Sequence, residues 1–260
     1  MIIEFSKYQG TGNDFVLLNN LDGRYDDLSI GQIQLLCDRR FGVGADGLIK
    51  INSSADTAFE VDYYNSDGSK SFCGNGARCA VSFAGKIGLD VSETLFDAFD
   101  GLHKAAFDNE EVSLEMTDVN AVEEYGEDYV LYTGSPHYVR FVKGLDLIDV
   151  VEIGKSIRYS ERFNVEGINV NVAEVKADKS LAVLTYERGV EDETLSCGTG
   201  VTAVTLAYAY QQEMIGKHTV DVKVKGGALK VAFNQTAKGV FSDIQLIGPA
   251  VFVYSGEINV

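Results

Sequence analysis

Two of the four cysteines in this sequence share one local setting. Cys73 precedes Gly74-Asn75-Gly76, Cys197 precedes Gly198-Thr199-Gly200, and an apolar, helix-like run follows each. The unpaired amides and the positive dipole at a helix N-terminus stabilise a thiolate, and the same amides can bind a carboxylate. Glycine lets the backbone approach a ligand closely. We therefore expect each stretch to supply one proton-transfer group and one anion cradle, and the two thiols to move a proton on and off a carbon atom.

The two stretches are parts of an internal repeat. Arg40-Phe41 aligns with Arg162-Phe163, and the first Cys-Gly stretch aligns with the second. Tyr63 likewise falls on Tyr186, and residues 12–16 fall on 134–139 when one residue is inserted. The offset drifts only from 122 to 124 residues along the chain. Matches in the same order indicate two similar halves, each with its own cysteine.

The two halves are expected to contain the same elements, because strands follow a period of two and helices a period of 3.6. Strands are expected at 15–19, 47–51, 58–65, 111–116, 138–142, 169–175, 180–187, 219–224, 228–233 and 239–247, and helices at 29–40 (with Ser29 as N-cap), 77–87, 145–156 and 201–212. The last of these runs carries no charge, so it should be buried on most sides. The simplest packing is an α+β fold of two pseudo-symmetric domains, each a barrel-like, mostly antiparallel sheet around a central helix. Both Cys-Gly loops should lie at the cleft between the domains.

Composition excludes several classes of partner. The net charge of −17 argues against nucleic acid, because phosphate binding needs clustered Lys and Arg. No apolar run reaches the roughly 20 residues that span a bilayer. The N-terminus lacks the basic and apolar regions of a signal peptide, so we expect a cytoplasmic protein with no membrane contact and with reduced thiols. Without C-x-x-C spacing or nearby histidines, the cysteines predict no metal site.

Two further cysteines and one glycine-rich stretch are expected to be structural. Cys37 lies on the apolar face of its helix, and Cys79 lies inside the helix after Cys73, where its counterpart in the repeat is Ala203. Residues 42–47 match G-x-G-x-x-G, but a dinucleotide site needs a strand before this motif and a helix after it. Here the order is reversed, so the stretch should line the cleft instead.

Polar residues near strand ends are candidates for recognition of an amino acid. Glu187 and Arg188 end a strand just before the second Cys-Gly loop, and this pair suits an ammonium and a carboxylate. The alternative is a surface ion pair. Asn13, Asn65 and Asn169 lie at strand ends or in tight loops, where Asn is also an ordinary turn residue. A lone histidine is more often structural than catalytic, and we expect this of His137.

Eight motifs keep one order from near residue 10 to the C-terminus. They are Gly10-Thr11-Gly12-Asn13-Asp14-Phe15, Gly42-Val43-Gly44-Ala45-Asp46-Gly47, Asn65-Ser66-Asp67-Gly68, Cys73-Gly74-Asn75-Gly76-Ala77-Arg78-Cys79, Glu187-Arg188-Gly189, Glu193-Thr194, Cys197-Gly198-Thr199-Gly200 and Gly248-Pro249-Ala250-Val251. Together they resemble the diaminopimelate epimerase family.

This resemblance implies an isomerase that interconverts LL- and meso-diaminopimelate, in lysine and peptidoglycan precursor biosynthesis, without pyridoxal or another cofactor. It assigns proton transfer to Cys73 and Cys197. It assigns substrate binding to Asn13, Asn65, Gly74, Asn75, Asn169, Glu187, Arg188, Gly198 and Thr199. It also implies a homodimer, with a first domain of residues 1–119 plus the last strand, 250–260, and a second domain of residues 120–249.

Two positions depart from the family's pattern, and other functions stay open. Many members have Gln where this chain has Gly47, and Asn-Pro-His where it has Ser135-Pro136-His137. Ser135 can still form a hydrogen bond, whereas water or a neighbouring side chain would have to replace the Gln. One alternative is a racemase or isomerase of the same fold, such as a proline racemase-like or methylaconitate isomerase-like enzyme. Others are a thiol redox protein and a non-catalytic amino-acid-binding module.

Overall fold

The computed structural model describes residues 1–260 and divides into two compact units. Unit 1 comprises Met1–Leu114 and Gly248–Val260, and unit 2 comprises Glu115–Ile247. The sequence placed these boundaries at 119/120 and 249/250. Val119 belongs to unit 2 because its backbone pairs with Phe241 there. None of the helices has the length and apolarity that a membrane crossing requires.

The two units repeat one sheet topology. In unit 1, β1 (Ile2–Gly10) is antiparallel to β2 (Asn13–Asn20), β2 is parallel to β3 (Gly47–Asn52), β3 is antiparallel to β4 (Phe59–Asn65), and β4 is parallel to β5 (Thr94–Ala98). In unit 2 the same series runs through β9 (Asp128–Tyr132), β10 (Pro136–Phe141), β11 (Asn169–Val175), β12 (Leu181–Glu187) and β14 (Gly216–Val224). An antiparallel pair then follows in each unit, β6 (Gly101–Asp108) with β7 (Glu111–Glu115) and β15 (Gly227–Ala237) with β16 (Val240–Pro249).

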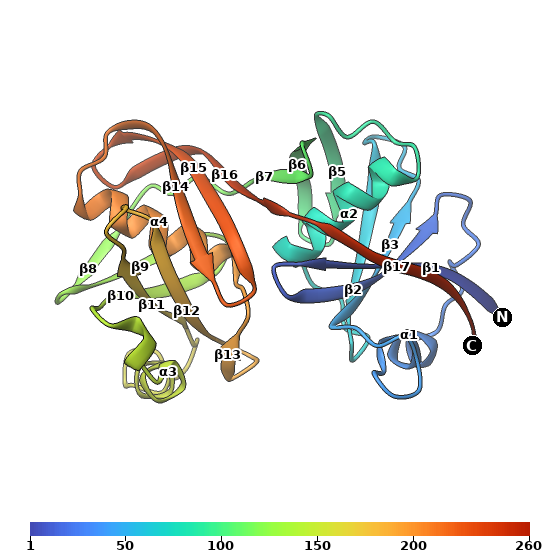
Figure 1. Cartoon of the computed structure of the whole chain (residues 1–260), viewed down its shortest axis with the longest axis horizontal. Coiled ribbons are helices and arrows are strands. Elements are labelled where there is room, and N and C mark those ends of the chain that lie inside the picture. The colour runs from blue at the N-terminus through green and yellow to red at the C-terminus, as the bar shows by residue number, and fades with distance from the viewer. The chain divides into compact units, whose positions relative to one another are not determined.

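Each sheet encloses one helix and carries another outside. In unit 1, α2 (Gly74–Lys86) contacts β1 to β4 and β6, and in unit 2, α4 (Gly198–Gln211) contacts β9 to β12, β14 and β15 (Figure 1). The outer helices are α1 (Ile30–Cys37), which contacts β3, and α3 (Val150–Arg158), which contacts β11 and β12. The expected fold class, two pseudo-symmetric α+β units with a barrel-like sheet around a central helix, is confirmed.

The inner strands are buried on both faces, which explains their apolar runs. Val16 and Leu18 of β2 pack with Leu36 of α1 in one core. Phe15 lies on the other face, next to Gly76 at the start of α2. The helix α4 is buried continuously from its third residue, Gly200, over ten positions, as its lack of charge predicts.

The N-cap residues determine where the helices begin, and several helices therefore start at other positions than the sequence predicted. The helices α2 and α4 begin three residues earlier than expected, because Cys73 and Cys197 are themselves the N-cap residues. The single helix expected at 145–156 is two elements, the 3-10 turn η1 (Leu145–Leu147) and α3. Asp149 separates them, because its carboxylate accepts hydrogen bonds from the first amides of α3. Ser29 caps α1 as expected, in a capping box.

Several strands were not expected from the sequence. They are β1, β5, β6, β8 (Glu123–Tyr125), β9 and β13 (Asp192–Thr194). The strand β1 of unit 1 corresponds to β9 of unit 2, and β5 of unit 1 corresponds to β14 of unit 2. The repeat therefore extends further than the motifs that revealed it. The last strand, β17 (Val251–Asn259), pairs antiparallel with β1 within unit 1.

Candidate active site

Cys73 is the N-cap residue of α2. Its Sγ accepts a hydrogen bond from the backbone N–H of Gly76 at 3.5 Å, and the residue is partly exposed. A thiolate here would be held by a backbone donor and by the positive end of the helix dipole. Cys79, which lies further along α2, is fully buried, and burial raises the pKa of its thiol to about 12. This supports the structural role expected for Cys79.

Two of the residues expected to bind substrate in unit 1 lie together. The side-chain Nδ2 of Asn75 donates to Oδ1 of Asn13 at 2.5 Å, and Nδ2 of Asn13 donates to Oδ2 of Asp46 at 3.1 Å. Asp46 belongs to the glycine-rich stretch 42–47, which leads into β3. This stretch therefore supplies a carboxylate that holds Asn13.

Cys197 is the N-cap residue of α4, but its surroundings differ from those of Cys73. Its Sγ lies 3.5 Å from Oγ1 of Thr199, and only 8% of the residue is exposed. Thr199 takes the place of Asn75 in the repeat. Its backbone carbonyl accepts from Oγ1 of Thr133 at 2.8 Å, and its hydroxyl lies 2.9 Å from Nε2 of His137. Thr199 thus connects a thiol with an imidazole.

His137 is a fully buried histidine whose tautomer is fixed by its neighbours. The backbone carbonyl of Tyr138 can only accept, so the Asn171 atom 3.0 Å from it is Nδ2, and this Nδ2 also donates to Nδ1 of His137. The ring proton is therefore on Nε2, which donates to the Thr199 hydroxyl. Burial lowers the pKa of His137 to about 3, so the ring stays neutral at physiological pH. The hydroxyl proton of Thr199 is left to donate to Cys197.

Asn169 joins the loop before β10 to the end of β12. Its Nδ2 donates to Oγ of Ser135 at 2.9 Å and to the carbonyl of Pro136 at 3.2 Å, and its Oδ1 accepts from the backbone N–H of Arg188 at 2.9 Å. Ser135 thus keeps a hydrogen bond, as the sequence allowed. Every polar atom of the Asn169 amide is engaged within unit 2.

Glu187 and Arg188 do not pair with each other. The exposed Arg188 donates through Nη1 to the carbonyl of Glu166 at 2.8 Å, and burial raises the pKa of the Glu187 carboxyl. The alternative of a surface ion pair between these two residues is therefore wrong. Their charges remain available for an ammonium and a carboxylate.

A neighbouring side chain takes the space beside Gly47. A Cβ on Gly47 would come within 2.4 Å of the Tyr63 ring and 2.8 Å of its hydroxyl, so there is no room for a side chain at position 47. The Tyr63 hydroxyl donates to Oδ1 of Asn65 at 3.1 Å, and Nδ2 of Asn65 donates to Oγ of Ser69 at 2.9 Å and to Oγ of Ser71 at 3.1 Å. Asn65, the last residue of β4, is therefore held by Tyr63 and by the turn that follows, and the Tyr63 ring fills the space that a side chain at position 47 would need.

The family model for diaminopimelate epimerase matches residues 5–122 and 129–253. The chain belongs to the diaminopimelate epimerase family. A diaminopimelate epimerase of Flavobacterium psychrophilum is 45% identical over 257 residues, which cover 97% of this chain and 98% of the relative. One of Chlorobaculum tepidum is 39% identical over 260 residues, covering 96% and 99%. The resemblance drawn from the motifs is confirmed.

Solved structures of low sequence identity share the fold of this member of the diaminopimelate epimerase family. A PhzF-family phenazine biosynthesis protein of Bacillus anthracis has a TM-score of 0.78 at 14% identity, and all of both chains is covered. A hydroxyproline epimerase of Agrobacterium vitis has a TM-score of 0.67 at 13% identity, covering 99% of this chain and 92% of the other. At these identities the likeness establishes the fold alone.

Three buried polar residues around the diaminopimelate epimerase motifs were missed or undervalued from the sequence. His137 and Asn171 lie beneath the second Cys-Gly loop, and Arg78 lies in α2. The side chain of Arg78 is fully buried, and its Nη2 donates to Thr11 and Asn75 at 3.1 and 3.0 Å. Arg in an apolar helix and Asn in an apolar strand were usable signals, because such residues are rarely buried without partners.

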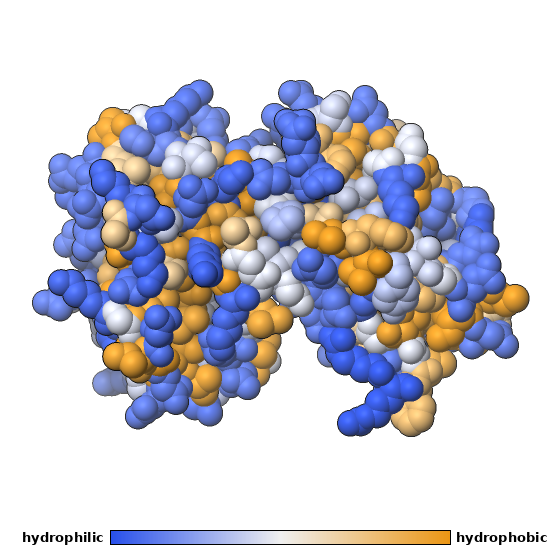
Figure 2. All heavy atoms as spheres, viewed as in Figure 1, coloured by the Kyte–Doolittle hydropathy of each residue, from blue (hydrophilic) through white to orange (hydrophobic).

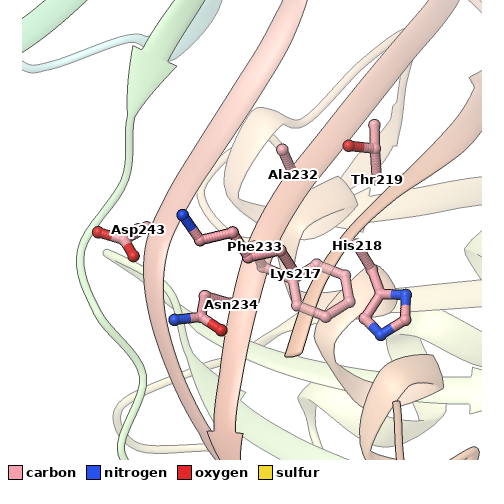
Figure 3. Close-up of a pocket in the computed structure, with 7 residues that line it drawn as sticks. All are labelled: Lys217, His218, Thr219, Ala232, Phe233, Asn234 and Asp243. Atoms are coloured by element: carbon pink, nitrogen blue, oxygen red, sulfur yellow. The ribbon is translucent and has the colours of Figure 1, made fainter. Parts of the chain in front are cut away.

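A separate cavity of about 330 Å³ lies on the strands β14 to β16 (Figure 3). It is lined by Lys217, His218, Thr219, Ala232, Phe233, Asn234 and Asp243. The His218 ring lies 5.8 Å from that of Phe233. None of the residues described above lines this cavity, so we assign it no part in the chemistry. No group of three or more His, Cys, Asp or Glu side chains is placed to hold a metal ion.

Proposed function

We propose that this protein interconverts LL- and meso-diaminopimelate without pyridoxal and so supplies precursors for lysine and peptidoglycan. The observation that carries this proposal is the 45% identity to a diaminopimelate epimerase over 97% of the chain. The local chemistry of the two Cys-Gly helix starts agrees with it. Because the reaction needs reduced thiols, the protein would act in a reducing compartment, the cytoplasm.

Cys73 and Cys197 are the proposed proton-transfer groups. An α-proton is weakly acidic, so its removal needs a base on one face of the carbon and an acid on the other. The thiolate of one cysteine takes the proton as the C–H bond breaks, and the thiol of the other delivers a proton to the opposite face. The electron pair is held meanwhile on the α-carbon and its carboxylate. The reverse reaction starts from the opposite protonation pattern.

Backbone amides are proposed to bind the carboxylate on which charge develops. Gly74-Asn75 and Gly198-Thr199 form the first turns of α2 and α4, where unpaired amides and the helix dipole favour an anion. The remaining substrate groups are assigned to side chains. Glu187 suits an ammonium and Arg188 a carboxylate, with further polar contacts from Asn13, Asn65 and Asn169.

The proposal is tested by running the reaction in deuterated water with a panel of amino acids. We expect the ¹H NMR signal of the α-proton of LL-diaminopimelate to disappear as the meso isomer forms, because the proton delivered to the second face comes from solvent. Proline and hydroxyproline serve as matched substrates for other enzymes of the fold. Exchange at proline but not at diaminopimelate would show a racemase of different specificity, and binding without exchange would show a binding module.

We also propose a homodimer formed through β17. This strand pairs with β1 on one edge only, and its first four residues, Val251 to Tyr254, are each 42% to 52% exposed. Hydrophobic surface gathers over this strand in Figure 2. A long apolar edge strand is a template for pairing with another chain, and an apolar patch of this kind marks an interface. A second copy of the chain is the occupant that we propose.

The dimer proposal is tested by placing charges on the exposed part of this strand. Val251 and Val253 are 43% and 52% exposed, and Val253 lies at the bulge where the register between β17 and β1 shifts. The double variant Val251→Lys/Val253→Lys is expected to sediment as a single 28.3-kDa chain, while the unmodified protein sediments at twice that mass. Leu102→Lys, at an exposed hydrophobic residue of β6, is the control and should stay dimeric. A dimer that survives both lysines would place the interface elsewhere.

A further inference from the structure

We propose that Arg78 and Asp46 are positioning residues that together fix the orientation of the Asn75 and Asn13 side-chain amides. The inference rests on the proposed role of these two asparagines in substrate binding. Neither charged residue needs to touch the substrate. Arg78 acts through Asn75, and Asp46 acts through Asn13. Because the two asparagines are hydrogen-bonded to each other, the effects of Arg78 and Asp46 are coupled.

The four side chains form a chain of hydrogen bonds that all run in one direction. Nη2 of Arg78 donates to Oδ1 of Asn75 at 3.0 Å, Nδ2 of Asn75 donates to Oδ1 of Asn13 at 2.5 Å, and Nδ2 of Asn13 donates to Oδ2 of Asp46 at 3.1 Å. A guanidinium only donates and a carboxylate only accepts. Turning either amide over would therefore set donor against donor on one side and acceptor against acceptor on the other. The charges at the two ends decide which way both amides point.

The donor end of this chain is a buried cation without an anionic partner. Arg78 forms no ion pair with Asp or Glu, and its Nε and Nη1 have no hydrogen-bond partner. Its only other bond runs from Nη2 to Oγ1 of Thr11 at 3.1 Å. Burial of a half-satisfied guanidinium is unfavourable for folding, so stability does not account for this residue.

The acceptor end is anchored from two sides. Oδ1 of Asp46 accepts from Nη2 of Arg39 at 2.8 Å, and Oδ2 also accepts from the backbone N–H of Asp14 at 3.2 Å. The same Arg39 nitrogen reaches the Asp14 carboxylate at 2.6 Å, and Lys7 reaches it at 2.7 Å. The carboxylate that ends the chain is therefore held in place while Asn13 binds to it.

The direction of these four side chains' hydrogen bonds determines whether they present a donor or an acceptor to a ligand. Both amide oxygens already accept a hydrogen bond, and Nδ2 of Asn13 uses only one of its two protons within the unit. The chain thus presents a donor and suits a carboxylate of the substrate better than an ammonium. Unit 2 has no counterpart, because Thr202 stands at the position of Arg78 and donates to the carbonyl of Gly198 in its own helix.

A double-mutant cycle tests the coupling between the two ends. Arg78 and Asp46 do not contact each other, so independent structural roles would give additive effects on KM. We expect Asp46→Asn and Arg78→Met each to raise KM for LL-diaminopimelate by about 10-fold, because a hydrogen bond to a charged group is lost, with a smaller change in kcat. The double variant should raise KM by about 10-fold as well, and not by the roughly 100-fold of independent effects. Arg78→Lys keeps a cationic donor and should recover part of the loss.

Asp62→Asn is the matched control. Asp62 is a carboxylate of the same unit that pairs with Lys50 and Lys70. It takes no part in the hydrogen bonds that connect Arg78 with Asp46. Its effect on KM should be small and additive with that of Arg78→Met. Additive effects of Asp46→Asn and Arg78→Met would overturn the proposal.

A second measurement needs neither activity nor the arginine variant. In ¹⁵N-labelled protein, the side-chain amide resonances of Asn75 should shift in Asp46→Asn, because the two residues are connected through Asn13. Unchanged Asn75 resonances would overturn the proposal even if Arg78→Met does not fold. Failure of the unmodified protein to epimerise diaminopimelate would instead count against the proposed function and would leave this NMR result unaffected.

Discussion

Cys73→Ser and Cys197→Ser are each expected to lower kcat for epimerisation by about 10³-fold or more, the upper part of the range for general acid–base catalysis. A serine hydroxyl is not ionised near neutral pH, so it cannot take the α-proton as a thiolate does. Both directions of the reaction need both residues, because the base in one direction is the acid in the other. The double variant should be little worse than either single one, since residues that act as a unit are not additive.

The measurement is stereoisomer conversion in deuterated water, followed by NMR beside thermal melting of each variant. Cys37→Ala is the control, because this buried cysteine lies in α1, where burial raises the pKa of its thiol to about 11. It should keep kcat and lose some stability. Wild-type epimerisation by either active-site serine variant would exclude the two-thiol mechanism.

The internal repeat predicted the backbone of both halves but not the side chains beneath the cysteines. Phe15 and Ile49 lie against the first Cys-Gly loop at Gly76. The corresponding residues of unit 2 are His137 and Asn171, as the shared strand pairings establish. One loop therefore rests on an apolar layer and the other on a hydrogen-bonded one. A repeat reveals equivalent positions, and it carries no information where the residue types differ.

Long-range contacts explain the other differences between sequence and structure. The bond from His137 to Thr199 spans 62 residues, and so does the bond from Asn75 to Asn13. Neither contact is visible in local spacing, so His137 was expected to be structural and Arg78 was given no role. The N-terminus of α1 could be predicted from the sequence, because Ser29 and Gln32 have the spacing of a capping box. Cysteine is an unusual N-cap, which is why both central helices begin earlier than expected.

His137→Phe is expected to slow epimerisation by about 10- to 100-fold, the effect of removing one hydrogen bond that supports a charged group. Nε2 of the neutral ring donates to the Thr199 hydroxyl, which leaves the hydroxyl proton for the Cys197 sulfur. Phe resembles the ring in size and stands at the corresponding position, Phe15, in unit 1. It provides no donor, so the Thr199 hydroxyl is free to turn away from the thiolate.

Alkylation of Cys197 by iodoacetamide in a Cys73→Ser background measures this support directly, because only the thiolate reacts. At a fixed neutral pH the rate should fall in His137→Phe and in Thr199→Val. It should be largely kept in His137→Gln, whose amide provides a donor, and in Thr199→Ser, which keeps the hydroxyl. Equal alkylation rates in all four variants would show that the histidine only fills space.

The pH dependence of stability distinguishes a buried neutral histidine from a charged one. The pKa of His137 is lowered to about 3 in the folded protein, against an ordinary value of 6.5, so between these values the unfolded chain binds a proton that the native state excludes. This contribution to stability is complete above about pH 6.5 and is lost as the pH falls toward 3. The melting temperature of His137→Phe should therefore decline less steeply than that of the unmodified protein over this window. Parallel curves would mean that the native ring titrates normally, and the fixed donation from Nε2 to Thr199 would then be wrong.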